Sequence, residues 1–163
     1  MNHKIDTDQQ VFFYEQDFYV LSNFSAFRVQ WKGIDFDTSE HAYHWEKFSN
    51  AWNSVGSIAE QVRRAPSAHA AFKLAEICKP RRRPDWNEVK AEIMRGILKA
   101  KVDQHEYVKR KLLETGTREL VEDSWRDDFW GWGPNKNGKN MLGRIWMEIR
   151  DELRAADSRC IAA

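Results

Sequence analysis

The stretch Ile34-Asp-Phe-Asp-Thr-Ser-Glu-His-Ala-Tyr-His-Trp-Glu-Lys-Phe48 decides the fold class, because the sequence pattern changes from strands to helices inside it. Upstream, short runs rich in β-branched and aromatic residues predict strands at 11–15, 18–21, 27–31 and 34–36. Lys32-Gly33 joins the last two of these strands as a hairpin turn. Downstream, Thr38 or Ser39 can cap a helix that continues to the end of the quoted stretch.

Helical patterns account for most of the remaining chain. Caps, proline boundaries and apolar spacing predict further helices at about 57–64, 67–78, 84–100, 105–114 and 140–155. The spacing in the two long helices predicts core faces made of Val89, Ile93, Ile97 and Ala100, and of Leu142, Ile145, Ile149 and Leu153. A small antiparallel N-terminal sheet followed by helices predicts a helix-rich α+β fold rather than a βαβ fold.

Length and composition favour one domain. The 163 residues are 42% apolar and 13% aromatic, which argues against disorder. We expect a flexible arm at 1–10, a domain at 11–155 and a tail at 156–163. The 26 Lys and Arg against 25 Asp and Glu give a net charge of +1, which excludes a broadly basic nucleic-acid-binding surface.

Cysteine usage and the N-terminus predict a compartment. Cys78 and Cys160 are the two cysteines and neither lies in a CxxC motif, which favours a reducing environment. The N-terminal residues lack the apolar core of a signal peptide, and no window resembles a membrane span. The sequence therefore predicts a soluble cytoplasmic protein.

The first candidate site lies on the helix that starts near Thr38. Glu40, Tyr43 or His44, and Lys47 share one helical face. Glu40 lies in the first turn, where the helix dipole favours the ionised carboxylate, and such a group can stabilise a developing cation or orient a water. The alternative is a capping carboxylate with a solvated lysine.

His41 and His44 form an HxxH pair, but no third ligand has the spacing of a metal site. We therefore expect no metal, and expect His41 to be a core residue or to support another residue of the site. The remaining histidines, His3, His69 and His105, are expected at the surface.

A basic segment precedes the long helix. Lys79-Pro-Arg-Arg-Arg-Pro-Asp-Trp86 places four cations in five residues just before a helix start, which is typical of a phosphate-binding segment. Trp86 offers a face on which a base can stack. The alternative is a solvated loop with Trp86 in the core.

The glycine- and tryptophan-rich segment Asp127–Gly143 contains a GxxxxGK pattern at Gly133–Lys139. It is not interpreted as a P-loop, because Asn140 stands where that motif needs Ser or Thr, and no preceding buried strand is evident. Backbone N–H groups before a helix can still bind an anion, and the aromatic residues can form the wall of a base pocket. The alternative is a tight loop held by buried aromatics. No GxSxG motif or Cys–His spacing indicates nucleophilic Ser or Cys catalysis.

Together these segments resemble the NADAR family, also called YbiA-like proteins. The residues that carry the resemblance run from about Phe13 to Arg150: Leu21-Ser-Asn-Phe24, Thr38-Ser-Glu-His-Ala-Tyr43, Lys47-Phe48, Lys79-Pro80, Asp85-Trp86, Val89-Lys90, Met94, Leu98-Lys-Ala-Lys101, Asp127, Trp130-Gly131, Gly138-Lys-Asn-Met-Leu-Gly143 and Met147-Glu-Ile-Arg150.

The resemblance implies an α+β, helix-rich N-glycosidase that cleaves a base–ribose bond. Family substrates include phosphoribosylated pyrimidine intermediates of riboflavin synthesis and ADP-ribose attached to guanine. The family's SEH glutamate, its tryptophan before the long helix and its aspartate ahead of the WG pair correspond to Glu40, Trp86 and Asp127. Trp132 departs from the smaller or acidic residue common there, which affects the expected pocket shape.

The resemblance and the bottom-up interpretation agree on an oxocarbenium-like centre stabilised by a carboxylate. Glu40 would stabilise that cation or activate water, Asp127 would orient substrate or assist the leaving base, and Lys47 would bind phosphate or form a Schiff base with the sugar. The expected substrate-binding residues are Ser22, Asn23, Phe24, His41, Tyr43, Lys79, Arg81, Trp86, Trp130, Gly131, Gly138 and Asn140.

We expect no metal and no cofactor. The partner is the substrate itself, either a small molecule or an ADP-ribosylated guanine within single-stranded nucleic acid, and no membrane partner is expected. A non-catalytic reader of ADP-ribose or a related nucleotide is the alternative function. The oligomeric state is left open.

Overall fold

The computed structural model describes residues 6–14, 16–49 and 57–161. The chain divides into two compact units. Unit 1 contains the described parts of Met1–Ser22 and Glu106–Ala163, and unit 2 spans Asn23–His105. Helices dominate both units and the strands are short, so the predicted helix-rich α+β class is confirmed.

Unit 2 begins with the predicted hairpin. Strands β2 (Val29–Trp31) and β3 (Ile34–Phe36) pair antiparallel, with Trp31 opposite Ile34. Lys32 and Gly33 at the turn have φ values of 51° and 77°, the left-handed pair that matches the twist of the flanking strands. The indole of Trp31 lies against Gly96, where an added Cβ would come within 2.5 Å of it.

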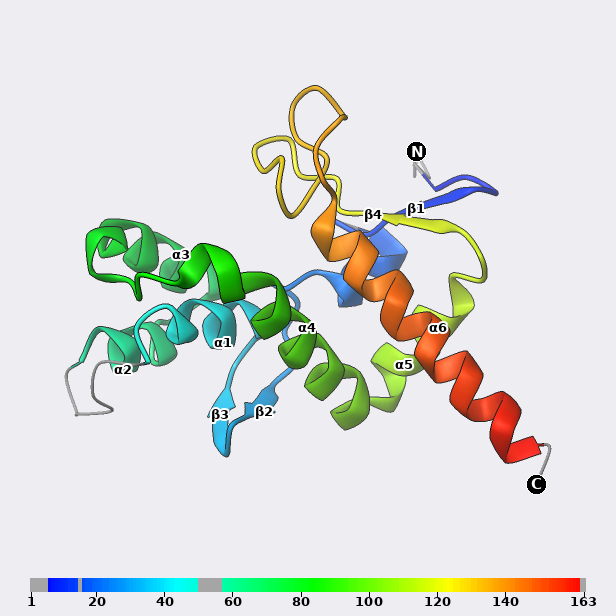
Figure 1. The fold of residues 1–163 in the computed structure, drawn as a ribbon, viewed down its shortest axis with the longest axis horizontal. Helices are drawn as coiled ribbons and strands as arrows, with labels where there is room; N and C mark the ends of the chain where they lie inside the picture. The colour runs from blue at the N-terminus through cyan, green and yellow to red at the C-terminus, as the bar shows by residue number, and fades with distance from the viewer. Residues whose placement is uncertain (1–5, 15, 50–56, 162–163) are drawn as a thin grey trace. The chain divides into compact units, whose positions relative to one another are not determined.

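The helices of unit 2 are α1 (Ser39–Glu46), α2 (Ile58–Arg63), α3 (Ala68–Ile77), the 3-10 helix η2 (Lys79–Arg81) and α4 (Trp86–Gln104). Thr38, Ser57 and Ser67 cap the first three, each side-chain oxygen accepting a backbone N–H three residues on. Every residue of α1 is buried. It packs against α2, α3 and α4 and is the central helix of this unit (Figure 1).

The core face of α4 differs from the predicted one. Of the four expected residues only Ile97 is buried; Val89, Ile93 and Ala100 are half-buried. The buried residues are Trp86, Met94, Ile97, Leu98, Lys101 and Val102. The buried face of α4 is rotated from the predicted one because α4 packs on both α1 and β2. It also buries the aliphatic stem of Lys101, and a search for apolar residues does not count a lysine.

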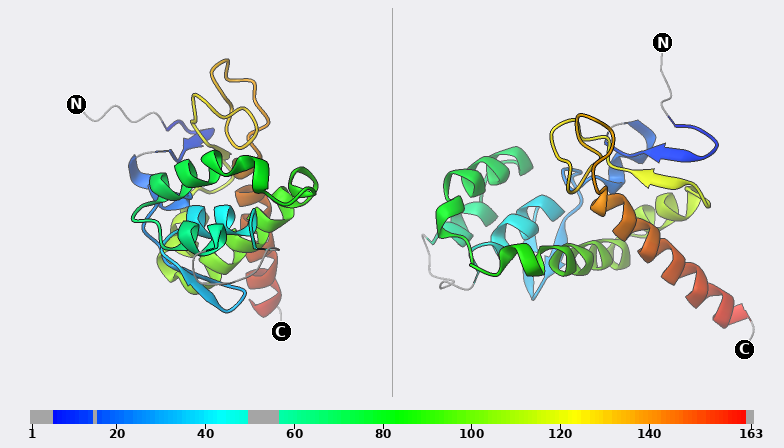
Figure 2. Two further views of the ribbon diagram at one scale, coloured as in Figure 1. Left: turned by 90° about the vertical axis from the view of Figure 1, so that its left-hand side faces the viewer. Right: turned by 45° about the horizontal axis from the view of Figure 1, so that its top comes forward.

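Unit 1 contains a strand pair that the sequence did not predict. Strand β1 (Gln10–Phe12) pairs in parallel with β4 (Glu119–Val121), and the two run side by side in both figures of the fold (Figure 1, Figure 2). The strand expected at 18–21 is wrong, because η1 (Gln16–Leu21) is a 3-10 helix. Phe18 and Leu21 are buried while Tyr19 between them is exposed, a three-residue spacing that fits a 3-10 turn.

The remaining helices of unit 1 are α5 (Glu106–Glu114) and α6 (Met141–Ile161). Leu142, Ile145 and Ile149 of α6 are buried as predicted, whereas Leu153 is half-buried, and the helix continues past the expected end at Ala155. The loop between β4 and α6 folds over the N-terminal end of α6 (Figure 2). Within the described residues, no helix combines the length and apolar character needed to cross a membrane.

Candidate functional site

The polar face of α1 carries the first part of the candidate site. Glu40 lies in its first turn, and its backbone N–H donates to the Asn23 carbonyl at 3.1 Å. The side chain is held by His44 one turn later, whose Nε2 lies 2.7 Å from Glu40 Oε1. Both side chains are buried, with exposed fractions of 9% and 2%. The carboxylate is therefore oriented by an imidazole inside the protein, and is not a surface cap.

Lys47 follows Glu40 by two turns and is also buried. Its amine lies 5.4 Å from the centre of the Tyr43 ring and 5.7 Å from that of Trp86, and 3.7 Å from Glu76 Oε1. Burial lowers the pKa of this amine, and the charges of Glu76 and Glu40 oppose the shift. The solvated-lysine alternative is wrong, and this side chain is set up to lose its proton more readily than a surface lysine.

Helix α3 supplies the other side of the cluster. Its core face is made of Ala68, Ala71 and Ala75, and beside that face lie Phe72 and Glu76. The Phe72 ring packs edge-on against the His44 ring at 5.7 Å, one turn from the Glu76–Lys47 contact. We call these five residues, Glu40, His44, Lys47, Phe72 and Glu76, the α1–α3 cluster.

Three residues that adjoin Glu40 in sequence or by a hydrogen bond carry a buried polar atom with no hydrogen-bond partner among the residues described: Asn23 Oδ1, Ser39 Oγ and His44 Nδ1. Buried polar groups are normally paired, so unpaired atoms on residues that neighbour Glu40 are compatible with a bound molecule that supplies partners. Asn23 is held in place by its other amide atom, which donates to Met94 Sδ at 3.3 Å.

Trp86 lies in the core rather than in an open stacking position. It is 2% exposed, its ring centre is 4.9 Å from that of Tyr43, and the Lys47 amine lies over it. Of the two interpretations of Trp86, the core one is correct. Tyr43, itself 5% exposed, likewise forms part of the wall around Lys47.

The basic segment is tied to α1 through Arg83. The Arg83 N–H donates to the Lys47 carbonyl at 2.8 Å, and its guanidinium pairs with Asp85 at 2.6 and 2.8 Å. Lys79 reaches Glu76 at 3.8 Å, and Arg81 is exposed. The segment therefore places cations near Lys47, two of them already paired with carboxylates.

His41 has a structural role. Nδ1 lies 2.8 Å from Thr38 Oγ1 and Nε2 lies 3.0 Å from the Ala65 carbonyl, so both ring nitrogens are used inside the fold. The core interpretation of His41 is confirmed, and its predicted role in binding substrate has no free ring atom to support it. Across 6–14, 16–49 and 57–161, no group of three His, Cys, Asp or Glu side chains is placed to hold a metal ion.

Two further predicted binding residues lie near Asn23 in sequence. Phe24 in unit 2 is 38% exposed, a large apolar surface next to a buried residue of the site. Ser22 belongs to unit 1, is 2% exposed, and its N–H donates to the Tyr19 carbonyl.

Asp127 organises a turn in unit 1. Its Oδ1 accepts the N–H groups of Phe129 at 2.8 Å and Trp130 at 2.7 Å. Gly131 is required in this turn because an added Cβ would come within 2.7 Å of the Glu122 carbonyl. The Asp127 carboxylate thus shapes the loop that carries the WG pair.

The prediction that backbone N–H groups at the start of α6 bind an anion is wrong, because these groups already donate within the loop. The N–H groups of residues 138–142 donate to the carbonyls of Trp132, Asp128, Gly131, Phe129 and Trp130. Asn140 bridges to β4, accepting the Glu122 N–H and donating to the Leu120 carbonyl. Gly138 is needed for close packing, because a Cβ there would lie 2.6 Å from the Asp128 carbonyl. The tight-loop alternative is correct for this segment.

Trp132 is fixed at the same loop. Its indole N–H donates to Asp123 at 2.7 Å, and its ring centre lies 5.1 Å from that of Phe12. The residue that departs from the family pattern is therefore an anchored part of unit 1.

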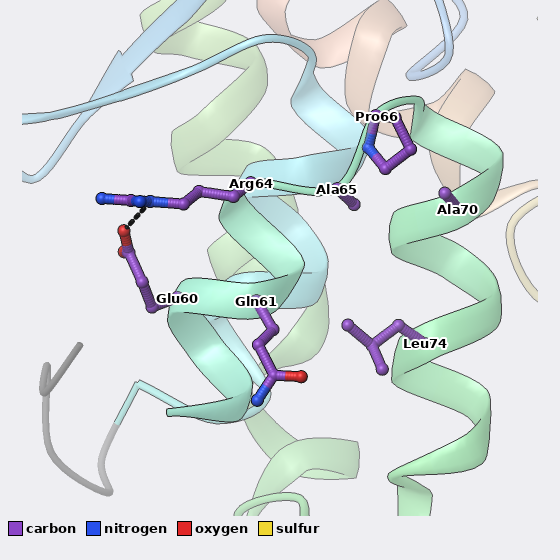
Figure 3. A pocket seen from close by; sticks show the side chains of 7 residues that line it. All are labelled: Glu60, Gln61, Arg64, Ala65, Pro66, Ala70 and Leu74. Carbon is purple, nitrogen blue, oxygen red and sulfur yellow. Dashed lines mark hydrogen bonds and ion pairs between the residues drawn. The ribbon is translucent and has the colours of Figure 1, made fainter. Parts of the chain in front are cut away.

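A cavity of about 510 Å³ opens between α2 and α3 (Figure 3). Its lining residues are Glu60, Gln61, Arg64, Ala65, Pro66, Ala70 and Leu74, none of them a predicted site residue. Hydrogen bonds from Arg63 and Arg64 lower the pKa of Glu60 to about 2. This carboxylate is held in ion pairs and cannot donate a proton near neutral pH.

Sequence reasoning missed Phe72 and Glu76, and it placed His44 on the face of Glu40 and Lys47 without giving it a role in holding Glu40. The available signal is the spacing of His69, Phe72 and Glu76, which share one side of an alanine-rich helix. Which helix face that stripe meets depends on how α1 and α3 pack, and the sequence does not show it.

The fold and the α1–α3 cluster describe a helix-rich α+β protein with a buried carboxylate, imidazole and amine, an arrangement typical of enzymes. The NADAR domain family matches residues 12–154, and the chain belongs to that family. The resemblance predicted from the motifs is therefore confirmed.

Individual relatives agree with this assignment. N-glycosidase YbiA of Escherichia coli is 34% identical over 84% of this chain and 82% of its own length. An N-glycosidase of Nostoc punctiforme is 34% identical over 88% of this chain and 92% of that protein. A riboflavin biosynthesis protein of Vibrio vulnificus is 37% identical over 90% of this chain, which spans only 39% of that longer protein. The NMR structure of E. coli YbiA matches with a TM-score of 0.80 at 32% identity, covering 94% of this chain and 89% of that chain.

Proposed function

We propose that this protein is an N-glycosidase that hydrolyses the bond between a nitrogen heterocycle and C1′ of a ribose, with the α1–α3 cluster as its reaction centre. The observation that carries the proposal is the buried amine of Lys47, of lowered pKa, on the same helix face as the buried carboxylate of Glu40. The class of reaction is supported by relatives that are named N-glycosidases and that match this chain over most of their length.

Glu40 stabilises the positive charge that develops on the sugar. As the C1′–N bond breaks, its electron pair leaves with the base nitrogen, and C1′ becomes oxocarbenium-like. A carboxylate held by His44 at 2.7 Å is oriented in advance, so it stabilises this cation without reorganising. The base nitrogen takes up a proton as it leaves.

Lys47 is the nucleophile in this scheme. Its neutral amine bonds to C1′ as the bond from C1′ to the base breaks, and the amine gives up a proton, which balances the proton that the base takes up. The C1′–O4′ bond then opens to give an imine, and water hydrolyses the imine to the sugar aldehyde and the free amine. The other suggested role, binding phosphate, fits less well, because Glu76 lies 3.7 Å from the amine and would repel a phosphate there. Lys79 has the same difficulty, since it lies 3.8 Å from Glu76, so the exposed Arg81 of the basic segment is better placed for that anion.

Two substrate classes follow, a phosphoribosylaminopyrimidine of riboflavin synthesis and an ADP-ribosylated guanine. The name of the Vibrio relative favours the first, although this chain spans only 39% of that protein. Both carry a ribose joined to a planar base and at least one phosphate, so both suit the same chemistry.

The test of the mechanism is reductive trapping. Wild-type protein incubated with each substrate and cyanoborohydride is digested and analysed by mass spectrometry. We expect a stable sugar adduct on Lys47, absent from Lys47→Met. Product release without any adduct would reject the amine route and leave attack by a water that Glu40 activates.

A further inference from the structure

Phe72 is a large apolar side chain left partly in solvent beside the reaction centre. It is 39% exposed, although its ring touches the buried His44 ring at 5.7 Å. On its other side the His69 ring lies 6.2 Å away and nearly parallel, at 26°. His69 and Phe72 are thus two exposed rings that stack on each other on α3.

We infer that Phe72 and His69 form the surface on which the departing base stacks, an inference that rests on the proposed function. Two contacts align the helices, His44 with Phe72 and Lys47 with Glu76. Both contacts advance toward the C-terminal ends of α1 and α3, so the two helices run in the same direction. His69, one turn before Phe72 on α3, therefore lies toward the Glu40 end of α1. A sugar with C1′ at Glu40 would extend its base over these rings.

The aromatic residue first expected to stack on the base is not available for it. Trp86 is 2% exposed, and Tyr43 and the Lys47 amine occupy its surroundings. Phe72 is the exposed aromatic ring that contacts the histidine holding Glu40.

The histidine that Phe72 contacts also carries an unpartnered buried atom. His44 Nδ1 has no hydrogen-bond partner among the described residues, although its side chain is 2% exposed. A phenyl ring makes no hydrogen bonds, so the surface selects for a planar ring and does not distinguish one base from another.

The test is direct binding, separate from turnover. The fluorescent purine 2-aminopurine is titrated with wild type, Phe72→Ala, Phe72→Trp and His69→Ala, and ribose 5-phosphate is titrated by calorimetry. Tyr107→Ala on α5 is the matched control, because Tyr107 is also a partly exposed aromatic on a helix, at 47%.

We expect Phe72→Ala to weaken 2-aminopurine binding about tenfold to a hundredfold, the range for one lost base–aromatic stack. Ribose 5-phosphate binding should stay within about twofold, and Phe72→Trp should restore base binding, since a larger ring stacks as well. His69→Ala should give a smaller loss than Phe72→Ala, and Tyr107→Ala none.

Three results would overturn the inference: unchanged base binding in Phe72→Ala, an equal loss of base and ribose 5-phosphate, or no saturable binding of 2-aminopurine to wild type. The proposed function fails separately, if wild type binds the base through Phe72 but hydrolyses neither substrate class.

Discussion

Glu40, His44 and Lys47 are three polar residues that the fold buries on one helix, at the cost of desolvating each of them. Their arrangement is specific. Glu40 is held by His44, while the Lys47 amine is 3.7 Å from Glu76. In the proposed function, these two pairs stabilise the charge that develops as the glycosidic bond breaks.

The pH dependence of activity follows from Lys47. A nucleophilic amine must be neutral, so kcat/KM should rise with pH and level off at the lowered pKa of Lys47, below its usual 10.5. Glu76 raises that pKa, so Glu76→Gln should move the rising limb to lower pH. The measurement is a pH profile of kcat/KM for both proteins.

Glu114→Gln on α5 is the matched control for Glu76→Gln, since the two side chains are 46% and 42% exposed. Its profile should overlay that of wild type. A wild-type profile with no rising limb, or one that Glu76→Gln leaves in place, would count against an amine nucleophile.

The loop elements of unit 1 depend on side chains that act on the backbone. Asp127 accepts two N–H groups, Asn140 bridges to β4, and Gly143 lets α6 approach β4. These residues belong to the motifs that resemble the NADAR family, and the structure gives each a packing role.

Gly143→Ala should be strongly destabilising, because the added Cβ would lie 2.0 Å from the Leu120 carbonyl. We expect a loss of about 3 kcal/mol in the free energy of unfolding, as for a severe overpacking change. Gly33→Ala meets nothing within 4 Å and carries only the strain of its φ of +77°, about 1 kcal/mol. Urea unfolding of both variants measures the difference, and equal losses would contradict the close approach of α6 and β4.

Asp127 can be tested for a role beyond its turn. Asp127→Ala removes the acceptor of two backbone bonds and should cost about 1–3 kcal/mol of stability. Asp127→Asn keeps the accepting oxygen but not the charge, so we expect near-wild-type stability, and reduced turnover if the carboxylate also orients substrate or assists the leaving base, as the family resemblance implies. Full turnover in Asp127→Asn would show that the carboxylate serves only the turn.

At the scale of the whole molecule, the protonation state of the buried Lys47 amine affects the free energy of unfolding. Between the lowered pKa of Lys47 and 10.5, the unfolded chain binds a proton that the folded chain does not. The free energy of unfolding therefore contains a contribution from Lys47 that increases as pH rises through this window.

The corresponding prediction compares wild type with Lys47→Met. Any constant effect of the methionine cancels when only the pH trend is considered. The unfolding free energy of wild type minus that of the variant should increase as pH rises toward 10.5. Urea unfolding across this range measures it, and a flat or falling difference would mean that Lys47 is not desolvated.

Local signals predicted much of the fold. Thr38, Ser57 and Ser67 cap the helices they were expected to cap, and Lys32-Gly33 forms its hairpin turn, because these signals act within four residues. The β1–β4 pair escaped prediction because it joins residues such as Gln10 and Glu119, 109 positions apart, through strands too short to show a pattern.

In the candidate site, too, the features set by local spacing could be predicted, and those set by helix packing could not. The shared face of Glu40 and Lys47 follows from helical spacing, and the structure buries both. Trp86 and Phe72 could not be ranked from sequence, because an aromatic side chain becomes a core residue or an open stacking surface only through helix packing. The backbone amides of residues 138–142 could not be seen as occupied, since their acceptors lie in a loop of irregular conformation.

The central claim is that Glu40 and its cluster cleave a base–ribose bond, and product mass spectrometry tests it most directly. A phosphoribosylaminopyrimidine and an ADP-ribosylguanine oligonucleotide are each incubated with wild type and with Glu40→Gln, whose folding is checked by circular dichroism. We predict release of free base or its nucleic acid and of the matching sugar phosphate from at least one substrate, reduced about a hundredfold or more in Glu40→Gln. Equal turnover by the two proteins, or none by wild type on either substrate, would contradict the account.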